Sequence, residues 1–178
     1  VEMNGEPSAV RETRERIVRE HMETESRHDF HATVATFSHP RYEIMPTGEV
    51  HDGPAQVAAI LNESHIAFPD FRIETLALHH SDDAVIAEVQ FHGTQTGAWR
   101  GLPATHRVVR YRMCNLFVFE GTNLVCERVY FDLLTVLRQV GIGRDPTSLA
   151  GRVATAFNHP IVVGRAFLRR LRSGSGRG

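Results

Sequence analysis

The chain has 178 residues and a formal net charge of −1, from 20 basic and 21 acidic side chains. All of the basic residues are arginine, and lysine does not occur. This composition excludes chemistry that needs a lysine amine, which includes Schiff-base formation, pyridoxal phosphate attachment and the lysine-bearing phosphate-binding loop.

The first 70 residues predict three helices and one short strand. In residues 9–25 the apolar side chains recur at the spacing of one helical stripe. Asp29 is a suitable N-cap for a short helix that ends before His39-Pro40. Gly53-Pro54 opens a third helix, because proline has a preset φ that suits the first turn. The expected helices span 9–25, 30–37 and 54–66, and the expected strand spans 42–45.

Four segments rich in Val, Phe and Tyr follow, and turn residues separate them. They predict successive antiparallel strands at 71–80, 84–96, 107–120 and 124–131. Helices followed by a run of long strands are typical of an α+β fold. We therefore expect a strongly curved antiparallel sheet that wraps around the N-terminal helices and encloses a pocket.

The C-terminal part differs in charge from the rest of the chain. Residues 1–144 carry 14 arginines against 20 acids, a net −6, whereas residues 145–178 carry six arginines against one acid, a net +5. After a helix at 133–140, we expect an Arg-rich helical extension over 145–178, broken at Pro160 and disordered in its last six residues. The sequence thus predicts an α+β domain at 1–144 followed by this extension.

The basic extension is amphipathic, which is compatible with an anionic membrane surface or nucleic acid. Its apolar content instead favours packing on the domain or on a second copy of the chain, with solvated arginines. No base-stacking motif accompanies it, so we expect no nucleic-acid partner.

The cysteines and the hydropathy of the sequence indicate the cellular compartment. The two cysteines, Cys114 and Cys126, form no CxxC pair, and no apolar run approaches the roughly 18 residues of a membrane span. The N-terminus lacks a charged-then-apolar signal pattern. We expect a cytoplasmic protein with no integral membrane segment.

A metal site has to be considered because the chain has 11 histidines. Groupings of this kind on a short polar helix or beside a turn are typical of solvent-exposed residues, so we predict no metal. The closest groupings are His28 with His31, and His79-His80 with Asp82-Asp83.

The segment Glu127-Arg128-Val129-Tyr130-Phe131-Asp132 is the most informative for chemistry. Strand alternation places Arg128, Tyr130 and Asp132 on one face and Val129 and Phe131 on the other. If the polar face is concave, a carboxylate enters an apolar cavity beside an arginine and a phenol, where burial raises its pKa and the arginine lowers it. If that face is solvated, these residues are structural.

Five short motifs occur in order over about residues 10–143, and together they resemble the SnoaL-like polyketide cyclase family of the nuclear transport factor 2-like superfamily. The motifs are Phe68-Pro69-Asp70-Phe71, Gly93-Thr94-Gln95-Thr96-Gly97, Gly101-Leu102-Pro103-Ala104-Thr105, the segment from Glu127 to Asp132, and Leu137-Arg138-Gln139-Val140-Gly141.

The resemblance implies a cone-shaped α+β fold around a deep pocket and a homodimer formed through the outer face of the sheet. It also implies an intramolecular aldol ring closure of a hydrophobic carbonyl compound, with no metal or cofactor. Asp132 matches the acid/base of the family. A carboxylate there would remove an activated proton and return it to the new alkoxide.

Other residues are expected to orient the substrate. Gln95 stands where the family often has histidine, and Gln95 and Asn115 would act as neutral hydrogen-bond donors to an enolate oxygen. Trp99 either caps the pocket or packs in the core, and Tyr42 either lines the cavity or belongs to the core. The expected substrate-binding residues are Arg128, Tyr130, Gln95, Asn115, Trp99 and Tyr42.

The leading hypothesis is therefore a cofactor-independent, cyclase-like enzyme that uses Asp132. The alternatives are a noncatalytic module that binds a small ligand in the same pocket, and an isomerase, dehydratase or hydrolase, because one fold can support several chemistries.

Overall fold

The computed structural model describes residues 8–174, and residues 1–7 and 175–178, which include most of the predicted disordered end, lie outside the described part. The elements in chain order are α1 (Ser8–Ser26), α2 (Phe30–Ala35), β1 (Arg41–Ile44), β2 (Glu49–Asp52), α3 (Pro54–Ala67), β3 (Arg72–His80), β4 (Ala84–Thr94), β5 (Val108–Glu120), β6 (Asn123–Phe131), α4 (Leu133–Gln139), α5 (Leu149–Asn158) and α6 (Pro160–Gly174).

The six strands form one curved sheet in the order β2-β1-β6-β5-β4-β3. Neighbouring strands are antiparallel except β1 and β6, which run parallel. The four long strands predicted from the sequence are β3 to β6. The predicted α+β fold is confirmed.

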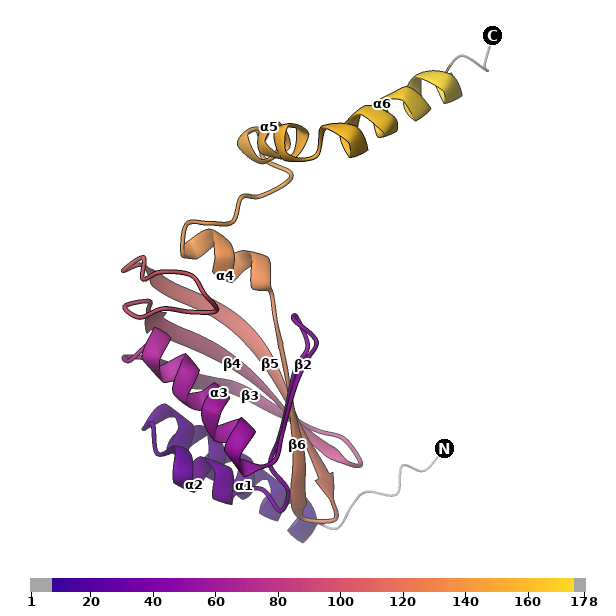
Figure 1. Cartoon of the computed structure of the whole chain (residues 1–178). Helices are drawn as coiled ribbons and strands as arrows, with labels where there is room; N and C mark the ends of the chain where they lie inside the picture. Colours follow the sequence, from indigo (N-terminus) through magenta and orange to yellow (C-terminus); the bar gives the residue numbers. More distant parts are fainter. Residues whose placement is uncertain (1–7, 175–178) are drawn as a thin grey trace.

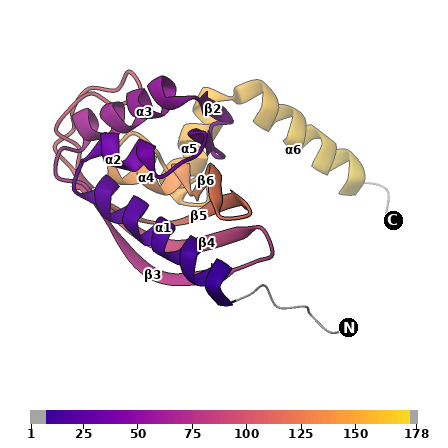
Figure 2. The ribbon, with the colours of Figure 1, turned by 90° about the horizontal axis from the view of Figure 1, so that it is seen from below.

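Helices α1, α2 and α3 cover one face of the sheet (Figures 1 and 2). Helix α1 buries Val18, His21 and Met22, which lie three or four residues apart and so share one helical face. Proline at the first position of α3 and the residues Phe68-Pro69 at its end set the limits of that helix, as predicted. The space between these helices and the inner face of the sheet contains the hydrophobic core.

Strand β2 was not predicted. Its sequence Glu-Val-His-Asp has no run of inward-facing apolar residues. The strand pairs only with β1, at the edge of the sheet. These residues form a strand because they pair with β1, since their sequence lacks the apolar alternation of a strand.

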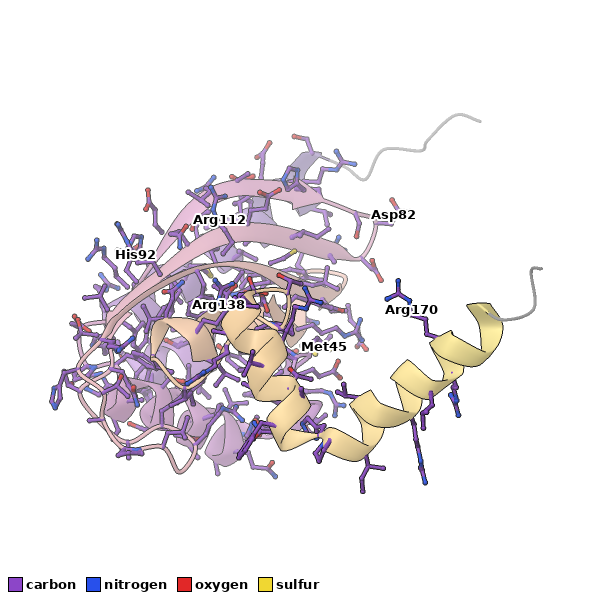
Figure 3. The ribbon with its side chains drawn as sticks, turned by 90° about the horizontal axis from the view of Figure 1, so that it is seen from above. Met45, Asp82, His92, Arg112, Arg138 and Arg170 are labelled. Atoms are coloured by element: carbon purple, nitrogen blue, oxygen red, sulfur yellow. The ribbon has the colours of Figure 1, made fainter. Side chains whose placement is uncertain are left out.

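Helices α5 and α6 project from the body (Figure 1), and Figure 3 labels Arg170 on α6. Proline begins α6, as the predicted break requires. Apolar side chains of both helices are exposed, including Leu149 at 78% and Phe157 at 85%, so these side chains do not pack on the domain within one chain. Packing on a second copy stays a prediction. No helix in residues 8–174 combines the length and apolar character of a membrane span.

Candidate active site

A cavity of about 100 Å³ lies between α1, α3 and the inner face of the sheet. Most of its lining is apolar or aromatic. Phe71 stacks on Phe91 with ring centroids 5.7 Å apart, and Phe68 meets Trp99 edge to face at 5.9 Å. The polar and charged lining residues are Glu25, Tyr42, Ser64, Arg100, Tyr111, Asn115 and Glu127.

A buried polar cluster forms the inner end of the cavity. We call it the His21 cluster, and its members are His21, Glu25, Tyr42, Asn115 and Glu127. Nε2 of His21 lies 2.8 Å from the Tyr42 hydroxyl, 3.1 Å from Oε2 of Glu127 and 3.4 Å from Oε2 of Glu25. Asn115 donates to Oε1 of Glu127 at 2.8 Å. One imidazole nitrogen therefore faces two carboxylates and a phenol away from water.

The other imidazole nitrogen is held by Thr36. The Thr36 hydroxyl donates to the Thr33 carbonyl oxygen at 2.7 Å, so it accepts the hydrogen bond from Nδ1 of His21 at 2.8 Å. Nδ1 thus carries a proton, and any second proton resides on Nε2 between the carboxylates.

The charges of the cluster follow from its burial. Burial alone would lower the pKa of His21, but hydrogen bonds to Glu127 and Glu25 outweigh it and raise the pKa to about 9. Burial raises the pKa of Glu25 above 4.5, and the charge of Glu127 adds to this effect against the hydrogen bond from His21. Burial also raises the pKa of Tyr42, which therefore remains a phenol. At neutral pH His21 is an imidazolium.

One oxygen of the cluster has no hydrogen-bond partner. Oδ1 of Asn115 is buried and makes no hydrogen bond, whereas Oε2 of Glu127 faces the His21 imidazolium at 3.1 Å. Buried polar atoms are nearly always hydrogen-bonded in native proteins. A hydrogen-bond donor on a bound molecule would satisfy Oδ1 of Asn115.

Three residues of the His21 cluster carry donor atoms that could hold a divalent metal. His21, Glu25 and Glu127 each offer one ligand atom, and these atoms lie within 4.8 Å of one another. One imidazole and two carboxylates suit zinc, iron or manganese. A metal would have to displace the Nε2 proton, because only a neutral imidazole binds one.

Asp132 lies outside the cavity lining. It is the N-cap of α4, where Oδ1 accepts from Leu134 N at 2.9 Å and Oδ2 from Thr135 Oγ1 at 2.6 Å. These hydrogen bonds, that from Thr135 above all, hold the pKa of Asp132 below 3.8. The carboxylate borders an open hollow on the outer face of the sheet, which also includes His92 and Arg112, labelled in Figure 3.

The expected alternation along β6 is present, but the polar face is not the one that lines the cavity. Glu127, Val129 and Phe131 line the cavity, whereas Arg128 and Tyr130 do not. Arg128 pairs with Glu43 at 2.7 Å. The apolar side chains face the helices because burying them stabilises the fold. The orientation expected for Arg128, Tyr130 and Asp132 is thereby corrected.

The structure brings three of the expected binding residues to the cavity, namely Tyr42, Trp99 and Asn115. Gln95 is fully buried but does not line it. Its side chain accepts from Thr105 Oγ1 at 2.6 Å and donates to Pro103 O at 3.1 Å, so it organises the loop between β4 and β5.

Sequence reasoning missed His21, Glu25, Glu127 and Arg100. Two signals were present. His21 and Glu25 follow Val18 at helical spacings of three and seven, on the apolar stripe of α1. Glu127 shares strand parity with Val129 and Phe131, so an acid stood on the apolar face of β6.

Comparisons with known proteins agree with this fold. The family model for SnoaL-like polyketide cyclases matches residues 15–140, well over half of the chain. The chain belongs to the SnoaL-like polyketide cyclase family. The match covers every residue that lines the cavity and ends before α5 and α6.

Solved structures support the fold of this SnoaL-like protein. A protein from Jannaschia sp. CCS1 described as a SnoaL-like polyketide cyclase is 15% identical, with a TM-score of 0.67 over 79% of this chain and 100% of its own. A polyketide cyclase-like protein from Xanthomonas campestris pv. campestris is 19% identical, with a TM-score of 0.68 over 74% and 99%.

A Catenulispora acidiphila protein with a ketosteroid isomerase-like fold, solved with trimethylamine, is 18% identical, with a TM-score of 0.61 over 71% and 92%. No curated protein matches the chain. At these identities the structural neighbours define the fold alone.

Proposed function

We propose that this SnoaL-like protein is an enzyme that moves protons next to a carbonyl group, with Glu25 as its acid/base. One observation carries the proposal. A carboxyl group whose pKa burial has raised lines an apolar cavity and contacts an imidazolium. An acid/base works best when its pKa lies near the working pH. Glu25 meets this condition better than Asp132, whose lowered pKa makes it a weak base.

The proposed reaction begins with proton abstraction. The Glu25 carboxylate takes a proton from the carbon beside the carbonyl, the C–H electron pair forms the enolate, and the proton stays on Glu25. The enolate carbon then attacks a second carbonyl of the same molecule, and Glu25 returns the proton to the new alkoxide. No electrons are gained or lost, and an aldol ring closure results.

The rest of the His21 cluster supports this cycle. The His21 imidazolium stabilises the carboxylate form of Glu25, and Glu127 keeps His21 charged. The Tyr42 hydroxyl, which donates toward Glu25 at 3.5 Å, and the Asn115 amide are neutral groups at the site of developing negative charge. Exclusion of water by the aromatic lining strengthens these interactions.

The cavity indicates a small substrate. Its volume of about 100 Å³ is near the roughly 150 Å³ at which an apolar protein cavity binds benzene. One six-membered ring is the matching size, and a multi-ring product would require the cavity to widen. The same small volume supports a second candidate, a noncatalytic module that binds a small ring compound.

The test uses cyclohexanone, a small ring ketone with exchangeable protons beside its carbonyl. Proton NMR in D₂O measures whether the protein accelerates exchange at these positions above a buffer background. We expect acceleration that saturates with cyclohexanone concentration and persists after treatment with EDTA. Saturable binding without acceleration would favour the binding module, and loss of acceleration in EDTA would favour a metal at His21, Glu25 and Glu127.

The pH dependence of this exchange separates the two acid candidates. If Glu25 is the base, the rate falls on the acid side at a pH above 4.5, because the raised pKa keeps its carboxyl protonated there. The rate falls again near pH 9 as His21 loses its proton. Because these groups titrate together, the two pH values at which the rate falls are apparent pKa values of the whole His21 cluster. An acid limb below 3.8 would instead assign the base to Asp132.

A further inference from the structure

A tight turn places Arg100 at the outer end of the cavity. Trp99 and Leu102 exchange two backbone hydrogen bonds, of 3.0 and 2.8 Å, around Arg100 and Gly101. Both central residues have positive φ, 48° for Arg100 and 78° for Gly101. Glycine, asparagine and aspartate are the usual residues in this turn, and a bulky side chain there is uncommon. Strain of this kind is concentrated at functional sites.

The Arg100 side chain is both a cavity wall and one half of an ion pair. Its Nη1 and Nη2 donate to the two carboxylate oxygens of Glu49 at 2.5 and 2.6 Å. Its guanidinium carbon lies 5.8 Å from the Trp99 ring centroid. Two parallel N–H···O bonds are the geometry in which arginine recognises a carboxylate. The pair with Glu49 therefore shows that the Arg100 guanidinium is oriented to bind a carboxylate.

Basic and acidic side chains lie at different ends of the cavity. Among the described residues that line it, Arg100 is the one basic side chain, and the acids Glu25 and Glu127 lie in the His21 cluster. The Arg100 side chain is 24% exposed, against 13% for Glu25 and 1% for Glu127, so the cation is nearer to solvent than the two acids. The rest of the cavity lining is mostly apolar or aromatic.

We propose that Arg100 recognises a carboxylate group of the substrate and that Glu49 holds this place in the free protein. The inference rests on the proposed function and narrows its substrate to a small ring compound with a carbonyl at one end and an acid at the other. Glu49 is 40% exposed on the edge strand β2, so its carboxylate reaches water when it is displaced. A substrate carboxylate would replace both hydrogen bonds that Arg100 makes to Glu49, so the guanidinium stays paired throughout the exchange.

A purely structural role makes a different prediction. If the pair only fastens the turn to β2, removing either partner has the same effect on ligands. If Arg100 is the receptor and Glu49 its competitor, the two removals have opposite effects on anionic ligands and none on neutral ones. The decisive comparison is therefore between Arg100→Met and Glu49→Gln.

The experiment measures binding of benzoate and of its neutral analogue benzamide by calorimetry at pH 7. Wild-type protein is expected to prefer benzoate. Arg100→Met should weaken benzoate binding at least about tenfold, whereas Glu49→Gln should strengthen it about threefold or more. Benzamide affinity should stay within about twofold in both variants, and Arg100→Lys should retain part of the preference for benzoate.

The proposal is overturned if wild type and Glu49→Gln bind benzamide as well as benzoate, if neither binds benzoate, or if both substitutions change benzoate affinity in the same direction. Thermal unfolding of each variant confirms that it is folded. Because binding is measured without turnover, benzoate selectivity can hold while ketone exchange fails, and the reverse result would reject the acid-bearing substrate while leaving the proton-transfer function intact.

Discussion

Replacing His21 by leucine is expected to lower the free energy of unfolding by about 3–5 kcal/mol at pH 7. The imidazolium is fully buried and is the cation that both Glu25 and Glu127 contact. Leucine would leave two carboxyl groups in an apolar interior with no opposite charge. Urea unfolding followed by the fluorescence of Trp99, the single tryptophan, measures the change.

The matched control combines His21→Leu with Glu25→Gln and Glu127→Gln. This triple variant contains no buried charge in the cluster, so it should recover most of the lost stability, because apolar or neutral replacements of a buried ion group are often tolerated. A triple variant as unstable as His21→Leu alone would show that His21 stabilises the fold by packing, and would contradict the charge assignment.

Replacing Glu25 by glutamine is expected to slow the exchange of cyclohexanone protons by 10²- to 10⁴-fold, the usual contribution of a positioned acid/base. This corresponds to about 3–5 kcal/mol of transition-state free energy. Glutamine has nearly the same shape and still accepts hydrogen bonds from His21 and Tyr42, but it cannot take up a proton. The change should therefore appear in the rate constant and not in cyclohexanone affinity.

Two controls accompany this variant. Glu25→Asp keeps the carboxylate but shortens its reach, so partial activity is expected, since misplacement by about 1 Å can cost 10²-fold. Cyclohexanone affinity measured by NMR shift titration checks that the cavity is intact. Exchange by Glu25→Gln within threefold of wild type would remove Glu25 from the mechanism.

Much of the fold could be predicted from the spacing at which apolar residues recur. Strands β3 to β6 are long and alternate clearly, and α1 and α3 carry apolar stripes, so the α+β architecture follows from the sequence. Strand β2 could not be predicted because its four residues have no apolar period and form a strand only against β1. The positive φ of Arg100 also depends on the turn and not on its residue type.

The site was harder to predict because it combines elements distant in sequence. The sequence shows that Arg128, Tyr130 and Asp132 share one parity on β6, but the inner face is chosen by packing against helices. The position of His21 on the apolar stripe of α1 indicates burial, but its role depends on contacts with Tyr42 on β1 and Glu127 on β6, which the sequence does not show. Asn115 was expected at the site from the family resemblance, and Tyr42 was expected either to line the cavity or to belong to the core.

Two expectations drawn from the family resemblance stay predictions. A homodimer would give the exposed apolar side chains of α5 and α6, or the outer face of the sheet, a second copy to pack against. A catalytic role for Asp132 would require its carboxylate to leave Leu134 N and Thr135 Oγ1 and reach a substrate on the outer face of the sheet.

The most direct test of the central claim, that proton transfer takes place at the His21 cluster inside the cavity, compares Glu25→Gln with Asp132→Asn in the same cyclohexanone exchange assay at pH 7. Both substitutions remove one carboxylate and change little else in shape. We predict that Glu25→Gln loses at least 10²-fold in rate, whereas Asp132→Asn stays within about threefold of wild type, since it alters only a helix cap. The opposite result, with activity lost in Asp132→Asn and retained in Glu25→Gln, would contradict the account and place the chemistry at the end of β6.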